Sequence, residues 1–159
     1  MTTEKHPMTI QGYNDLKEEL DHLKRVERLN IVKEIEVARG HGDLKENAEY
    51  HAAKEKQGMV EARIKYLNAK LAMSEVIDPK TLSGSRVMFG ATVTIYDLDT
   101  DEEKTYQIVG DEEADIKLNR ISYASPIAKA LIGKQEGDEA VIHAPKGSRN
   151  VEISEVEYK

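Results

Sequence analysis

Two carboxylates, Asp43 and Glu46, lie three residues apart, just after Gly40 and Gly42 and at the start of a helical pattern. Residues three apart on a helix share a face, so both could approach one hard cation such as Mg²⁺ through oxygen ligands. The structural alternative is that Asp43 is an N-cap and Glu46 completes a near capping box. Two carboxylates are too few to hold Mg²⁺ tightly, so the metal interpretation requires further ligands from a partner.

The same stretch offers little other chemistry. His41 and His51 flank the acids, but the spacing of His41, Asp43 and His51 matches no compact zinc motif. The glycine pattern is too short for a phosphate loop, and the chain has no cysteine and no serine nucleophile motif. The chain alone is therefore not predicted to be an enzyme.

Two helical patterns must position these acids, one before the glycines and one after them. The first begins near residue 10, is disturbed at residues 26–30, and carries an apolar stripe at Tyr13, Leu16, Leu20, Leu23, Ile31 and Ile35. The second carries its stripe at Ala48, Ala52, Val60, Ile64, Leu67 and Leu71, and we expect Ile77-Asp78-Pro79 to break it. Two such stripes joined by a tight turn predict an antiparallel coiled-coil hairpin with acids at its tip.

Basic side chains on and behind the tip permit two interpretations. Arg39, Lys45, Lys54, Lys56 and Arg63 could form a modest strip that guides a single strand or an RNA end. Alternatively they are ordinary exposed residues, paired at helical spacing with Glu49, Glu55 and Glu61. Spacing alone favours the second interpretation without excluding the first.

Beyond Pro79 the apolar period changes from that of a helix to that of a strand. Residues 91–96, 105–108, 139–143 and 151–153 alternate as strands do, and residues 125–133 have the cap, proline and glycine of a short helix. The fold class is therefore predicted to be α+β, with a coiled-coil domain at 1–79 and a small, mostly antiparallel sheet domain with one helix at 80–159. A docking patch is expected around Ile121, Tyr123 and Ile132, with Ser125, Pro126 and Ile127 as its candidate contact residues, although these apolar residues could equally be core.

Composition limits the choice of partner. The 159 residues carry a formal net charge of −7 and include no cysteine. Neither half has the positive field of a free-standing nucleic-acid binder, so a protein partner, or nucleic acid reached through it, is expected. The lack of cysteine and of a long apolar run predicts a cytoplasmic protein with no membrane contact.

The tip stretch, from His41 to Ala53, resembles the signature of the bacterial GreA/GreB transcript cleavage factors. The resemblance covers nearly the whole chain. It extends to Met8-Thr9, residues 76–78, residues 89–94, residues 108–115, Ser125-Pro126-Ile127-Ala128 and residues 131–134.

The resemblance implies a coiled coil that enters the secondary channel of RNA polymerase and an FKBP-like domain that docks at the channel rim. Such a factor makes the polymerase cut backtracked RNA near its 3′ end, and it meets DNA only within the elongation complex. By position, Asp43 and Glu46 would help hold a catalytic Mg²⁺ shared with the polymerase, no cofactor being bound by the factor alone. Asn47 and Tyr50 would support the tip, and the factor is expected to act as a monomer.

Two other functions remain to be distinguished from cleavage stimulation. A channel-binding regulator of the same architecture could inhibit polymerase without inducing cleavage, but its tip acids would be altered, whereas Asp43 and Glu46 are intact. A scaffold-like coiled coil that acts apart from polymerase would also satisfy the composition. Capture of polymerase subunits by this chain would exclude it.

Overall fold

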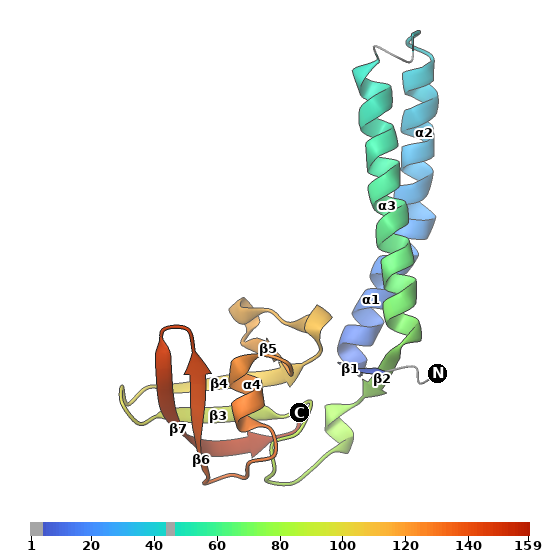
Figure 1. The fold of residues 1–159 in the computed structure, drawn as a ribbon. Helices are drawn as coiled ribbons and strands as arrows, with labels where there is room; N and C mark the ends of the chain where they lie inside the picture. Colours follow the sequence, from blue (N-terminus) through green and yellow to red (C-terminus); the bar gives the residue numbers. More distant parts are fainter. Residues whose placement is uncertain (1–4, 44–46) are drawn as a thin grey trace. The chain divides into compact units, whose positions relative to one another are not determined.

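A computed structural model describes residues 5–43 and 47–159, and its contacts divide the chain into two units (Figure 1). One unit, Tyr13–Met73, is a helical hairpin. The other joins the described residues up to Gly12 with Ser74–Lys159. This division by contacts differs from the predicted boundary at residue 79, because the first strand of the chain pairs with a strand that follows the hairpin.

The outgoing arm of the hairpin is one helix with a single irregular turn. It consists of α1 (Ile10–His22), a π-helical turn (Leu23–Glu27) and α2 (Arg28–Arg39), and helical backbone angles are kept at both junctions. The returning arm is α3 (Ala48–Ala72). The helix start near residue 10 is confirmed, and the disturbance predicted at residues 26–30 overlaps the π turn, a rare feature that occurs mostly as a single turn inside an α-helix.

A thin apolar seam holds the two arms together. Its buried members include Leu16, Ile31, Ile35, Ala38, Ala53, Ile64 and Leu67. The predicted seam positions Ala48 and Ala52 are wrong, because both are exposed and Ala53 is the buried alanine near the tip. Near the tip the buried residues of both arms are small, Ala38 on α2 and Ala53 on α3.

Ion pairs between the arms flank this seam. Arg63 binds both carboxylate oxygens of Glu19 at 2.9 and 3.0 Å, and Arg28 binds those of Glu61 at 2.8 and 2.9 Å. Bidentate arginine–carboxylate pairs fix geometry as well as charge. These two pairs therefore help fix how the arms are aligned along their length, because the seam itself contains few large apolar side chains.

Two short strands lie in the chain on either side of the hairpin. β1 (His6–Thr9) and β2 (Ser74–Ile77) pair in parallel, with His6 opposite Ser74. The prediction that the second helix continues to residues 77–79 is therefore wrong. The helix ends at Ala72, since the four residues of β2 are extended in order to pair with β1.

The larger sheet has five strands. They are β3 (Thr92–Asp97), β4 (Glu103–Val109), β5 (Arg120–Ser122), β6 (Glu139–Ala144) and β7 (Gly147–Glu157). Their order is β5-β4-β3-β7-β6, and every pairing is antiparallel except that of β4 with β5. β7 is thus an interior strand that contacts both β3 and β6.

The core of this unit lies between one face of the sheet and the helix α4 (Pro126–Leu131). Val93, Ile108, Leu131, Ile142 and Ile153 are fully buried there. The α+β class, with a helical hairpin followed by a mostly antiparallel sheet and one short α-helix, is confirmed. Within residues 5–43 and 47–159, no helix combines the length and the apolarity that crossing a bilayer requires.

Candidate functional site

The tip comprises residues 40–47, which join α2 to α3. Helix α2 ends at Arg39 with Gly40 as its C-cap, whose N–H donates to the carbonyls of Glu36 and Val37. Gly42 has a φ of 113°, a left-handed conformation in which a side chain would be strained. Gly42 therefore serves the chain reversal that was predicted, whereas Gly40 keeps a right-handed helical backbone that any residue can adopt.

The N-cap of the returning helix is Asn47, not Asp43. The side chain of Asn47 accepts a hydrogen bond from the Tyr50 N–H at 3.0 Å, and the helix begins at Ala48. The prediction of Asp43 as the cap is corrected, because the helix starts four residues later than its pattern indicated. Asparagine caps as well as aspartate does and also carries an N–H₂ group, which here donates to the Ala38 carbonyl at 2.5 Å.

Asp43 is exposed and lies beside a shallow hollow at the tip, together with His41, Asn47, Ala48 and Glu49. Its predicted partner Glu46 and the candidate basic residue Lys45 lie outside the described residues. The joint action of Asp43 and Glu46 on one cation therefore stays a prediction. An exposed carboxylate beside an open hollow is accessible to a cation that another molecule also binds.

Histidine takes part in the tip, but the zinc alternative is not supported. The His41 Nε2 lies 3.4 Å from a carboxylate oxygen of Glu49, whereas the His51 ring stands edge-on to Tyr50, with 5.6 Å between ring centroids. Across the two described ranges, no three His, Cys, Asp or Glu side chains are grouped in a way that could hold a metal ion. Tyr50 also packs on the seam cluster of Ile31, Ile35 and Ala53.

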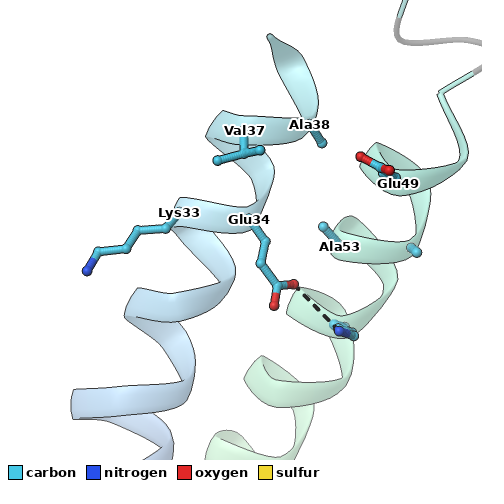
Figure 2. A pocket seen from close by; sticks show the side chains of 8 residues that line it. Lys33, Glu34, Val37, Ala38, Glu49 and Ala53 are labelled. Atoms are coloured by element: carbon cyan, nitrogen blue, oxygen red, sulfur yellow. Dashed lines mark ion pairs between the residues drawn. The ribbon is translucent and has the colours of Figure 1, made fainter. Parts of the chain in front are cut away.

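The predicted basic strip is partly neutralised by acids of the opposite arm. Lys56 pairs with Glu34 at 3.6 Å across the hairpin, the contact dashed in Figure 2. Lys54 donates to Gln57 at 3.2 Å, and Arg39 is exposed. Glu61 pairs with Arg28 and Glu49 with His41, so the structure shows pairs between the arms where pairs within the helix were predicted.

A second hollow lies just below the tip, between α2 and α3 (Figure 2). Its volume is about 450 Å³, and its apolar lining is Val37, Ala38, Ala52 and Ala53. Glu34 reaches across it toward α3, whereas Lys33 points away from α3. The small alanines leave this space open and keep the end of the hairpin narrow.

The candidate docking residues of the sheet unit have different local roles. Ser125 caps α4 by accepting from the Ala128 N–H at 3.2 Å, and Ile127 is half-buried against the sheet core. Pro126 is exposed. Of the wider patch, Ile121 is core and Tyr123 packs edge-on against Phe89, while Ile132 is 36% exposed.

The sequence did not predict two contacts at the tip, that of Asn47 with Ala38 and that of His41 with Glu49. Asn47 and Tyr50 were expected only to support the tip, and the bond from Asn47 to Ala38 was not foreseen. A cap-forming asparagine directly before Ala48-Glu49-Tyr50 was a signal equal in strength to Asp43. The His41–Glu49 pair had no signal, because it depends on how the chain reverses.

Comparison with known families gives two matches that together span most of the chain. Residues 6–76 match the model described as "Transcription elongation factor, N-terminal", and residues 82–158 match "Transcription elongation factor, GreA/GreB, C-term". The two matches follow one another along the chain and together cover residues 6–158 except for 77–81.

Curated relatives are similar over nearly their full length. "Transcription elongation factor GreA" of Hyphomonas neptunium is 58% identical over 156 residues, covering 98% of this chain and 99% of the relative. The protein of the same description from Xylella fastidiosa strain 9a5c is 58% identical over 153 residues, covering 96% and 97%. Among solved structures, the GreA factor homolog 1 (Gfh1) of Thermus thermophilus matches with 26% identity and a TM-score of 0.44, covering 97% of this chain and 99% of that one.

Proposed function

Because the chain belongs to the GreA/GreB family of transcription elongation factors, we propose that it binds RNA polymerase and stimulates the polymerase to cleave backtracked RNA. The hairpin would enter the secondary channel, and the sheet unit would dock at the channel rim. The factor would act as a cytoplasmic monomer and meet DNA only within the elongation complex. The observation that carries the proposal is the exposed Asp43 at the reversal of a thin hairpin.

The tip fits an incomplete metal site better than a complete one. Asp43 offers oxygen ligands of the kind that Mg²⁺ prefers, and no described cluster of three ligands accompanies it. Mg²⁺ shared with polymerase would stabilise charge on the attacking and leaving oxygens of the RNA phosphodiester. Asp43 and Glu46 would each add a carboxylate to ligands held by the polymerase, so the factor would not be an enzyme by itself.

The shaft of the hairpin supports this role. The bidentate Glu19–Arg63 and Arg28–Glu61 pairs join the two arms at two levels. Effective catalysis requires groups held close to their productive positions, and ties between the arms limit their sliding. Arg39, Lys54 and Lys45, the last of which lies outside the described residues, are candidates to lie near the RNA, while Glu34 offsets part of the charge of Lys56.

Among the candidate docking residues of the sheet unit, only an exposed side chain can contact polymerase directly. Pro126 at the start of α4 is the best candidate for direct contact with polymerase, since Ser125 and Ile127 also serve the cap and the core. A Pro126→Ala variant should bind polymerase more weakly and leave the sheet folded. Competition for polymerase with labelled intact protein measures that affinity.

The decisive experiment measures cleavage of end-labelled RNA in stalled, backtracked elongation complexes with Mg²⁺. The intact protein should release 3′ fragments and restart elongation, whereas the Asp43→Ala, Glu46→Ala variant should bind polymerase but do neither. A Glu36→Ala, Glu55→Ala variant removes the same charge from the shaft and should behave like the intact protein. Binding of the intact protein without cleavage would instead support the inhibitory function, and equal cleavage by all three would refute the role of the tip acids.

A further inference from the structure

One side chain, that of Asn47, ties the two arms of the hairpin together where they meet the tip. Its Nδ2 donates to the carbonyl of Ala38 in the last turn of α2, at 2.5 Å. Its Oδ1 accepts from the N–H of Tyr50 in the first turn of α3, at 3.0 Å. The same residue therefore caps one helix and binds the end of the other.

Only a side chain with both a donor and an acceptor can make this pair of bonds. Aspartate has the acceptor for the cap but, when ionised, no donor for a carbonyl. Serine caps helices about as well as asparagine, but its hydroxyl is shorter by one heavy atom. The Ala38 carbonyl also accepts from the His41 N–H at 3.1 Å, so it is held by both ends of the tip.

The residues enclosed by this bond are the ones that carry the proposed chemistry. Eight residues lie between Ala38 and Asn47, and they include Asp43 and Glu46. Glu46 is bonded directly to Asn47 through the chain, so a displacement of Asn47 is passed to it. The His41–Glu49 pair also spans the tip, but its side chains are 57% and 73% exposed, and exposed pairs constrain little.

We infer that Asn47 is a positioning residue for cleavage. By binding Ala38 it fixes the spacing of the arms, and so holds the acid-bearing segment where polymerase can use it. This inference rests on the proposed function, and it assigns Asn47 no contact with RNA or metal. A misplacement of about 1 Å can cost a reaction about 100-fold, so the loss of this bond should lower cleavage by about 10- to 100-fold.

The test compares Asn47→Ser with Asn47→Ala in the full chain. It separates the cap, which is the bond from the Tyr50 N–H to Asn47, from the tie, which is the bond from Asn47 to the Ala38 carbonyl. Asn47→Ser should keep the cap, shown by a protected Tyr50 amide in hydrogen exchange, and lose the tie. Asn47→Ala should lose both, and its Tyr50 amide should exchange faster. Both variants should cleave about 10- to 100-fold more slowly at saturating factor, with polymerase affinity within about twofold of the intact protein.

A second measurement reads the arm spacing without polymerase. The chain has no cysteine, so Glu36→Cys and Glu55→Cys, both at exposed positions, place two spin labels uniquely, one on each arm. Pulsed electron resonance should give a narrow distance distribution with Asn47 and a broader one with Asn47→Ser.

The outcomes distinguish this inference from the proposed function. Unchanged cleavage by Asn47→Ser would overturn the inference, whether or not the label distances broaden. Slower cleavage with an unchanged distance distribution would also overturn it, because Asn47 would then act by another route. If the intact protein fails to stimulate cleavage, the proposed function fails, while the label distances still show whether Asn47 holds the arms together.

Discussion

Deleting Lys24 from the π-helical turn should leave the hairpin folded, although a deletion inside a helix normally rotates everything beyond it. Ile31 follows Leu23 by eight positions. At 100° per residue, an unbroken α-helix would place Ile31 about 80° around the helix axis from Leu23. A π turn accommodates one extra residue, so the eight positions rotate the chain by only about seven α-helical steps. Ile31 then lies within about 20° of the helix face that carries Leu23. That residual is the usual drift of an α-helix over one heptad.

The shortened helix would therefore keep Ile31, Ile35 and Ala38 facing α3. Lys24 is exposed and no residue of the π turn is buried, so its removal costs no core contact. The chain length to the tip would change by no more than about 1.5 Å. We expect a loss of less than about 1 kcal/mol in the free energy of unfolding.

Deletion of Lys33 is the matched control, since it removes another exposed lysine from the same arm. It should rotate Ile35 and Ala38 by about 100° away from α3. Burial of one isoleucine contributes about 1.5–3 kcal/mol, so with Ala38 the loss should be about 2–4 kcal/mol. For a unit of this size that corresponds to a melting temperature lower by roughly 10 °C or more.

Thermal unfolding followed by circular dichroism at 222 nm suits this comparison, because the hairpin contains most of the helix in the described chain. The Lys24 deletion should melt within a few degrees of the intact protein, and the Lys33 deletion far below it. Equal destabilisation by the two deletions would refute the reasoning, because the π turn would then not be accommodating a surplus residue.

Two further predictions concern charge. The pKa of Asp97 lies below its ordinary value of 3.8, chiefly because the Asp99 N–H donates to its carboxylate, with smaller contributions from the Thr100 N–H and Arg149. This carboxylate therefore contributes stability above pH 3.8, and that stability is lost as the pH falls through its lowered pKa. In urea titrations, the free energy of unfolding of Asp97→Asn should fall less between pH 7 and pH 3 than that of the intact protein. The Arg28→Glu variant should lose at most about 1 kcal/mol at low salt, and adding Glu61→Arg should restore most of it. Failure of the double variant to melt above Arg28→Glu would show that this pair does not join the arms.

The long elements could be predicted from the sequence because each has a sustained period. The seam from Leu16 to Ile35 and the alternation at residues 92–96 each repeat often enough to exclude the other period. The short strands β1, β2 and β5 were missed. Each has only three or four residues, and each pairs in parallel with a strand from which helical segments separate it along the chain.

The residue types of the candidate site could be predicted from the sequence, but the contacts between its two arms could not. Asp43 and Gly42 were evident from their residue types, and the positive φ of Gly42 serves the reversal. The contacts of Asn47 with Ala38 and of Lys56 with Glu34 were not, because they join residues on opposite arms. Which of two good caps begins a helix depends on where the arms meet, and spacing along one arm does not carry that information.

The position of β7 in the sheet sets the order in which the two units can mature on the ribosome. All hairpin contacts lie within residues 13–73, so the hairpin can form as soon as that segment has emerged. The sheet cannot close until residues 147–157 follow, because β7 separates β3 from β6. A nascent chain can therefore carry a formed hairpin while the sheet still has an open edge at β3, and a stop codon before residue 147 would leave that edge unpaired by β7.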